Sequence, residues 1–148
     1  MARNDLQEFS EFIDATSEKL VDNLDKLMRE TALTIGTTVS SATPVDTGLA
    51  RVSWTAEVDE EDRSFIGKPV GASGQGQTNG GRAAGIAIQR IKENISDFDI
   101  LKNKEINISN NVNYIDDLNA GKSPQAEANF IESAIQTAVN EVKRARLL

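Results

Sequence analysis

Two stretches in the second half of the chain hold side chains that could do chemistry. Asp116 and Asp117 form a paired carboxylate, the residue type that serves as general acid and base in a hydrolase. Adjacent residues on a strand or turn point in different directions, so a solvated turn is the favoured interpretation and a carboxylate-dependent hydrolase a distant alternative. Gly121-Lys122-Ser123 matches the end of a phosphate-binding loop, but that loop needs a glycine where Asp116 stands. The sequence therefore predicts no nucleotide site.

The residue types that carry most catalytic chemistry are missing. The 148 residues include no histidine and no cysteine, which removes the commonest general base, thiolate nucleophiles and the usual transition-metal ligands. The acidic run 57–62 lacks the ligand spacing and the glycine of a calcium loop, so it is interpreted as a solvated turn. We expect a protein that is not an enzyme and that has no metal and no cofactor.

Charge and hydropathy narrow the class of partners. The net charge is −7, and an acidic surface repels phosphate backbones. The cations Lys143, Arg144 and Arg146 are the one candidate basic footprint, although cations at a helix end that complement its dipole are the favoured interpretation. No apolar run has the length of a membrane span, and the N-terminus is polar. The expected setting is a cytosol, with no membrane partner.

A long helix is predicted at the start of the chain. Its apolar positions are spaced by three or four throughout, which places them on one face: Leu6, Phe9, Ile13, Thr16, Leu20, Leu24, Leu27, Thr31 and Ile35. Four further residues widen that face, namely Phe12, Val21, Met28 and Ala32. We therefore expect more than one neighbour for this helix, and another subunit is a candidate for the second.

The stretch Thr43–Trp54, called here the first motif, follows that helix. Pro44 disfavours helical backbone at Thr43, so the helix should end at or before Ala42. Asp46, Thr47 and Gly48 favour a tight turn. A strand is predicted from near Leu49, with Val52, Trp54, Ala56 and Val58 on its buried face, then a hairpin tip at 59–62 and a partner strand at Arg63–Val70.

A glycine-rich loop is predicted over about residues 67–82. The stretch Gly67–Gly85 contains seven of the ten glycines, and such a composition does not order itself alone. We interpret it as a flexible loop that orders on a partner; the alternative is a long surface loop without a role. The candidate partner contacts are Gly71, Gly74, Gln75, Gly76, Gln77 and Asn79.

The remaining elements complete an α+β pattern. A middle helix is predicted at about Gly81–Phe98, and strand residues alternate over Ile106–Tyr114 with a break at Asn110. A final helix is predicted to open at Pro124 with Ser123 as its cap. The expected fold is one domain over residues 1–148, a small antiparallel sheet packed by a long N-terminal helix, a middle helix and a C-terminal helix.

The first motif, with Tyr114–Ala126 about sixty residues later as the second motif, resembles the tail-component family of tailed bacteriophages typified by the tenth gene product of phage HK97. In that family a long helix leads to a Thr-Pro-Val-Asp-Thr-Gly turn and a Ser-Trp strand end. A Tyr-containing strand, a Gly-x-Ser turn with Gln-Ala and a final helix follow later, and in this chain that helix is expected to begin around Asn129–Ile131. The resemblance covers most of the chain in order, but not the glycine-rich loop or the middle helix.

The resemblance implies a non-catalytic subunit of the virion, assembled in the bacterial host cytoplasm. Such a neck or tail-completion protein forms a ring with itself, of six or twelve copies, between head-completion or connector proteins and tail proteins. DNA passes through the ring without sequence-specific binding. A tail terminator or tail-tube-associated subunit is the alternative.

Two sets of residues follow from this interpretation. The expected structural turn and anchor residues are Pro44, Asp46, Gly48, Trp54, Tyr114 and Gly121. The acids of the first helix are hypothesised to line the DNA channel, where negative walls offer phosphates no counter-charge; the candidates are Glu8, Glu11, Asp14, Glu18 and Asp22.

Overall fold

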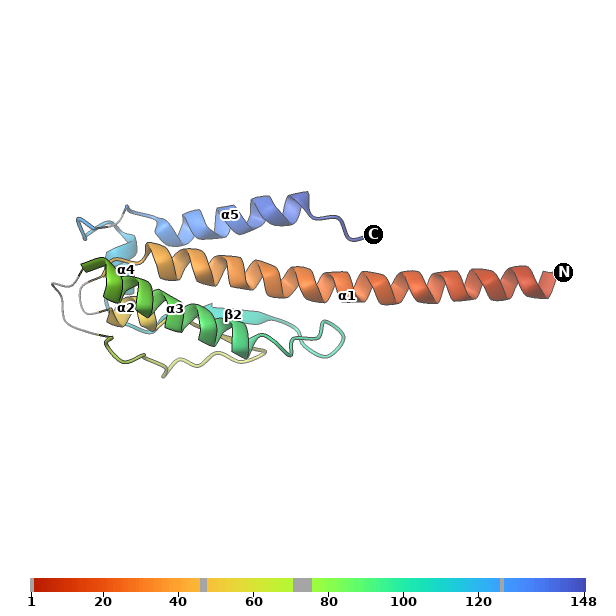
Figure 1. The fold of residues 1–148 in the computed structure, drawn as a ribbon, viewed down its shortest axis with the longest axis horizontal. Helices are drawn as coiled ribbons and strands as arrows, with labels where there is room; N and C mark the ends of the chain where they lie inside the picture. The colour runs from red at the N-terminus through yellow and green to blue at the C-terminus, as the bar shows by residue number, and fades with distance from the viewer. Residues whose placement is uncertain (1, 46–47, 71–75, 126) are drawn as a thin grey trace.

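A computed structural model describes residues 2–45, 48–70, 76–125 and 127–148 (Figure 1). The elements are, in chain order, α1 (Ala2–Ala42), α2 (Leu49–Val52), β1 (Thr55–Val58), α3 (Gly76–Asn94), β2 (Ile106–Ser109), α4 (Ile115–Asn119) and α5 (Phe130–Arg144). The predicted class is confirmed: the fold is α+β, with a two-stranded antiparallel sheet and long N-terminal, middle and C-terminal helices.

Helix α1 dominates the shape of the molecule. It runs for 41 residues and ends at Ala42, as the sequence predicts from Pro44. At 1.5 Å per residue its length is about 60 Å. The second half of α1 packs between α5 and α3, whereas its first half extends beyond every other element (Figure 1). We call residues 4–15, all of them exposed, the projecting segment.

The predicted strand from Leu49 is wrong in its first part. Leu49–Val52 is the short helix α2, because the backbone N–H groups of Val52 and Ser53 bond back to Gly48 and Leu49. The Ser53 hydroxyl adds a 2.6 Å bond to the Leu49 carbonyl, and such local bonds compete with strand pairing. The strand proper, β1, begins at Thr55, with Ala56 on its buried side.

The predicted hairpin between β1 and Arg63–Val70 is also wrong. Strand β1 pairs with β2 in antiparallel register, Thr55 opposite Ser109 and Val58 opposite Ile106. In the segment that follows β1, backbone groups form hydrogen bonds with side chains instead of with a partner strand. The Asp62 carboxylate accepts hydrogen bonds from the backbone N–H groups of Ser64 and Phe65 at 2.9 and 3.1 Å. The Asn111 amide donates to the Asp62 carbonyl at 2.6 Å. The segment is therefore irregular rather than a strand.

The predicted glycine-rich loop is shorter than expected, because α3 begins at Gly76 and not near Gly81. Gly76, Gln77 and Asn79 thus lie in a helix, while Gly71, Gly74 and Gln75 lie outside the described residues. The same helix ends at Asn94, four residues before the predicted end. Turns follow it, in which Phe98 is buried and its amide bonds to the Ile95 carbonyl at 3.2 Å.

Two predictions fail between β2 and α5. Strand β2 ends at Ser109, which confirms the predicted break at Asn110, but Tyr114 caps the short helix α4 instead of lying in a strand. Asp116 and Asp117 are accordingly on a helix. Helix α5 begins at Phe130 with Asn129 as its N-cap. The start at Pro124 with Ser123 as its cap is therefore wrong, whereas the start around Asn129–Ile131 expected with the resemblance is confirmed.

The core lies where α1, α3, α5 and the sheet meet. It contains Trp54 and Ala56 from the β1 region, Ile91 and Ile95 from α3 and Phe130 from α5, packed on the second half of α1. Gly36 allows α1 and α3 to approach closely, because a Cβ there would lie 2.7 Å from Cδ1 of Ile91. This core holds the end of α1 fixed to the sheet.

Candidate functional site

The first motif folds around the side chain and carbonyl of Thr43. The Thr43 hydroxyl donates to the Val39 carbonyl at 2.6 Å and accepts the indole N–H of Trp54 at 2.8 Å. Arg51 donates from Nε and Nη2 to the Thr43 carbonyl at 2.9 and 2.6 Å. Burial lowers the pKa of Arg51 below its ordinary value. The motif therefore ties the end of α1 to α2 and to the start of the sheet.

Gly48 is the turn residue of this motif. Its φ is +79°, in the left-handed region that favours glycine, and it caps α2. Pro44 is buried and lines the same cavity as Gly48. The predicted turn residue Asp46 lies outside the described residues. The turn thus depends on a glycine at position 48.

The second motif is organised by Asn119 at the end of α4. Its carbonyl accepts the Asn129 amide at 2.7 Å, and its side-chain oxygen accepts the Ile131 amide at 3.0 Å. Its amide donates to both carboxylate oxygens of Glu132, and this hydrogen bond lowers the pKa of Glu132. Asn119 therefore positions the first turn of α5.

Gly121 allows the chain to fold back on itself within this motif. It has a φ of +81°, and a Cβ there would lie 2.9 Å from Cβ of Ala128. Both the left-handed backbone and the close approach require a glycine at this position.

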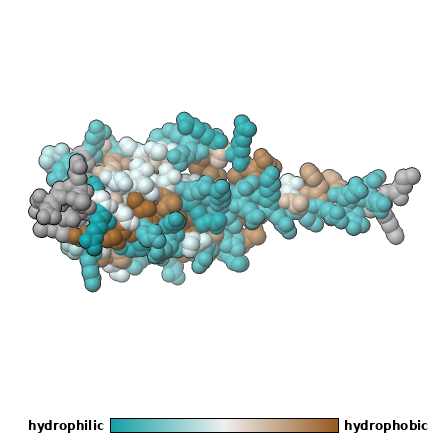
Figure 2. Space-filling model, in the orientation of Figure 1, coloured by the Kyte–Doolittle hydropathy of each residue, from teal (hydrophilic) through white to brown (hydrophobic). Residues whose placement is uncertain are grey.

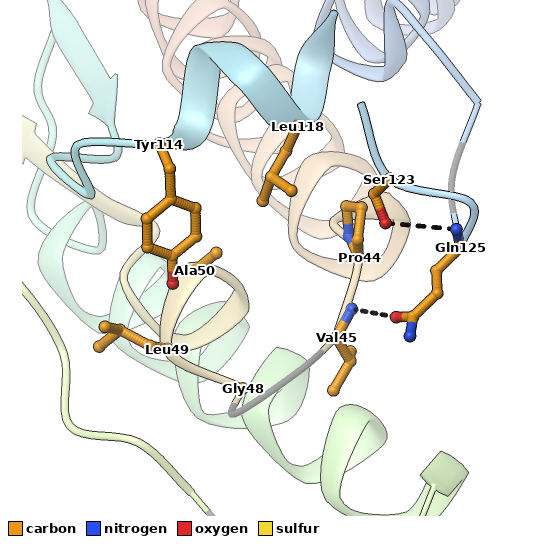
Figure 3. A pocket seen from close by; sticks show the side chains of 9 residues that line it. All are labelled: Pro44, Val45, Gly48, Leu49, Ala50, Tyr114, Leu118, Ser123 and Gln125. Atoms are coloured by element: carbon orange, nitrogen blue, oxygen red, sulfur yellow. Dashed lines mark hydrogen bonds between the residues drawn. The ribbon is translucent and has the colours of Figure 1, made fainter. Parts of the chain in front are cut away.

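The two motifs meet, although about sixty residues separate them in sequence. The side-chain Oε1 of Gln125 accepts a hydrogen bond from the backbone N–H of Val45 at 3.1 Å (Figure 3). The backbone N–H of Gln125 donates to the Ser123 hydroxyl at 3.2 Å. Between them is a cavity of about 90 Å³, lined by Pro44, Val45, Gly48, Leu49, Ala50, Tyr114, Leu118, Ser123 and Gln125. Ligand pockets are typically about 300–1,000 Å³. The cavity is thus smaller than a typical ligand pocket, and we call it the seam between the two motifs.

The candidate catalytic groups lie outside this seam. Asp117 forms a 2.6 Å ion pair with Lys122, and both side chains are largely exposed. Neither Asp116 nor Asp117 lines the cavity. Within the described ranges, no group of three or more acidic side chains is placed to hold a metal ion.

The candidate channel residues share one exposed face of α1. Glu8, Glu11, Asp14, Glu18 and Asp22 are all exposed. The apolar residues of the projecting segment are exposed as well: Leu6, Phe9 and Phe12 each exceed 60%, and Ile13 reaches 44%. The space-filling view shows hydrophobic surface among the hydrophilic surface of the projecting part of the molecule (Figure 2). Among the described helices, none is long and apolar enough to cross a membrane.

A groove beside α3 was not predicted from the sequence. It has a volume of about 510 Å³ and is lined by Val52, Phe65, Ile66, Gly67, Lys68, Pro69, Val70, Arg82, Ile86 and Arg90. Arg90 is one of the lining residues, and its Nη1 donates to the carbonyls of Val52 and Trp54 at 2.8 and 3.1 Å. Its guanidinium lies 4.5 Å from the centroid of the Phe65 ring. Arg82, Ile86 and Arg90 are four residues apart, a spacing that indicates one helix face.

Comparison with known proteins gives no assignment beyond this geometry. No family model matches the sequence, and no curated protein or solved structure is significantly similar to it.

Proposed function

We propose that this chain is a non-catalytic structural subunit of a ring at the head–tail junction of a tailed bacteriophage. In the virion it bridges connector and tail proteins, and DNA leaves through its channel. The resemblance of the first and second motifs supplies the class of assembly. The observation that carries the proposal is the projecting segment, whose apolar residues have no covering element in the described part of the chain.

The uncovered face is too apolar to be a solvated helix surface. Leu6, Phe9, Phe12 and Ile13 are exposed together along about two helical turns. Burying each such side chain contributes about 1.5–3 kcal/mol. An exposed contiguous apolar face of this kind marks an interaction site, and a subunit of an assembly has a partner to cover it.

The opposite face of the helix suits a channel. Glu11, Glu18 and Asp22 lie on the side of α1 away from Phe9 and Ile13, because 3.6 residues make one turn. When a neighbour covers the apolar side, these acids remain in solvent. Negative walls offer DNA phosphates no counter-charge, so the duplex slides past them.

The experiment is electron microscopy of phage particles assembled with and without this chain. Filled heads and finished tails that accumulate separately without it, and join when it is supplied, are the expected result. Tails of altered length with normal joining would favour a tail terminator, and particles with no defect would refute a role in the virion.

A matched pair of variants links that result to the projecting segment. Phe9→Ser with Phe12→Ser should abolish joining, because both rings lie on the exposed face of α1. Leu101→Ser removes an equally exposed apolar side chain elsewhere and should leave joining intact. Equal joining by the two variants would remove the projecting segment from the proposed role.

A further inference from the structure

The groove beside α3 is apolar with a basic rim. Ile66 and Ile86 expose apolar surface inside it, and Lys68 and Arg82 are exposed cations at its edge. Of the described residues that line it, none carries a negative charge. Its volume of about 510 Å³ lies within the range of about 300–1,000 Å³ that is typical of ligand pockets. Such a groove fits an apolar segment flanked by carboxylates.

The projecting segment has these properties. Leu6, Phe9 and Ile13 have the i, i+3, i+7 spacing with which a helix places anchors in a groove. Asp5 and Glu8 lie four residues before Phe9 and Phe12, so each carboxylate borders the apolar face one turn away. The helix therefore carries apolar anchors with negative charges at their edge, complementary to the groove.

We propose that the projecting segment of one copy docks in the groove of a second copy of this chain. Within one copy the contact is out of reach, because α1 is continuous and carries the segment to the far end of the molecule from residues 65–70 and the start of α3 (Figure 1). The inference rests on the proposed ring in taking the neighbour to be another copy.

The geometry of this contact sets the type of assembly. Each copy donates one helix and offers one groove, and these are different surfaces. Such a head-to-tail contact is heterologous, so repeated copies build a closed ring or an open filament. A two-fold dimer of the projecting segments alone would not use the groove.

The test measures self-association of the purified full chain by sedimentation velocity and mass photometry. Two variants disrupt one surface each. Phe9→Ser with Phe12→Ser, called the anchor variant, removes the central anchor Phe9 and the exposed ring of Phe12 beside it, and Ile86→Asp places a carboxylate in the groove. All three substituted positions are exposed, so folding, checked by circular dichroism, should be unchanged. Each variant alone should associate at least about tenfold more weakly than the wild type, equivalent to about 1.4 kcal/mol.

Mixing the two variants gives the sharper result. The anchor variant retains an intact groove and the Ile86→Asp variant an intact helix, so the mixture should form one-to-one pairs and nothing larger. Charge exchange provides a second test. Asp5→Lys with Glu8→Lys should weaken association, and Lys68→Glu with Arg82→Glu in the same chain should restore it.

Ile135→Asp is the matched control. Ile135 is 46% exposed on α5, against 38% for Ile86, and it lies outside the groove. This variant should associate as the wild type does. Association that survives Ile86→Asp, or that is lost in Ile135→Asp instead, would overturn the docking. A wild-type chain that stays monomeric at about 100 μM would overturn it as well, because a Kd of about 1 μM would give near-complete association at that concentration.

The docking and the proposed function fail separately. A chain that associates through the groove while particles join normally without it would refute the role in the virion alone. A chain that is needed for joining, and whose Ile86→Asp variant still associates, would refute the docking alone.

Discussion

Trp54 and Thr43 form the most consequential side-chain pair of the molecule. Trp54 is 4% exposed and donates its indole N–H to the Thr43 hydroxyl, which is itself buried. Truncation of Trp54 to Ala should cost about 3–5 kcal/mol because it empties part of the core. Thr43→Val should cost about 1–3 kcal/mol, since it leaves the buried indole donor without an acceptor. Urea unfolding measures both.

A double-mutant cycle isolates the hydrogen bond from the packing. In a Trp54→Phe background the donor is absent, so Thr43→Val should cost less than it does in the wild type. Trp54 is the single tryptophan, so its fluorescence follows unfolding of the chains that retain Trp54, and far-UV circular dichroism follows the two Trp54→Phe chains. The same cost for Thr43→Val in both backgrounds would show that the bond contributes nothing to stability.

A second residue-scale prediction concerns Asp59, which follows β1 with a φ of +60°. Hydrogen bonds from Asn103 and from the Lys104 and Glu105 amides lower the pKa of Asp59 below its ordinary value of 3.8. A lowered folded-state pKa stabilises the fold above pH 3.8, and this contribution is lost as the pH falls through the folded value.

Asp59→Asn should therefore be less stable than the wild type at pH 7, and the difference should shrink below pH 3.8. Thermal unfolding across the acid range measures both curves. Wild-type and variant curves that stay parallel there would show that the Asp59 carboxylate does not stabilise the loop beyond β1.

At the scale of elements, the contact between α1 and α3 depends on Gly36. A Cβ at this position would lie 2.7 Å from Cδ1 and 3.2 Å from Cγ2 of Ile91, whose side chain is fully buried. Gly36→Ala should thus destabilise the protein by up to about 2 kcal/mol, since overpacking outweighs the gain in helix propensity of about 1 kcal/mol.

The reverse is expected once Ile91 is shortened. Ile91→Val removes Cδ1, so Gly36→Ala in that background should be neutral or stabilising, because helix propensity then dominates. Chemical denaturation of the four chains gives the coupling between the two positions. If the two substitutions changed the free energy of unfolding independently of each other, the contact between Gly36 and Ile91 would not limit how closely α1 and α3 approach.

How far elements could be predicted depended on whether their signals are local. The end of α1 at Ala42 follows from Pro44 and from a long apolar periodicity, both of which are local. The partner strand of β1 could not be predicted from local signals. The side chains of Asp62, Asn107 and Asn111 form hydrogen bonds with backbone groups that a hairpin would use for strand pairing. The start of α3 was missed because glycines disfavour helix by about 1 kcal/mol each.

The candidate sites divide in the same way. Gly48 and Gly121 could be identified from turn chemistry in the sequence. The contact between Val45 and Gln125 joins segments 80 residues apart in the chain, and the groove places Val52 and residues 65–70 against one face of α3. Only the topology of the fold brings such segments together, so periodicity and spacing could not predict them.

At the scale of the whole molecule, the free energy of local opening should differ along α1, because only part of this helix packs on other elements. The second half of α1 packs on α3 and α5, whereas residues 4–15 are exposed on every side. A helical segment without tertiary packing is marginal in water and opens locally at little cost. In the monomer, amides of residues 4–15 should exchange hydrogen far faster than those of residues 32–42.

Assembly should remove that difference. Once the projecting segment lies in a neighbour's groove, opening requires undocking, so exchange at residues 4–15 slows as the protein concentration passes the association range. Hydrogen–deuterium exchange with mass spectrometry at low and high concentration measures this for each peptide. The Ile86→Asp chain serves as control and should exchange rapidly at both concentrations. Slow exchange of residues 4–15 in the dilute monomer would mean that the segment is stable without a partner, and the uncovered face would then no longer require one.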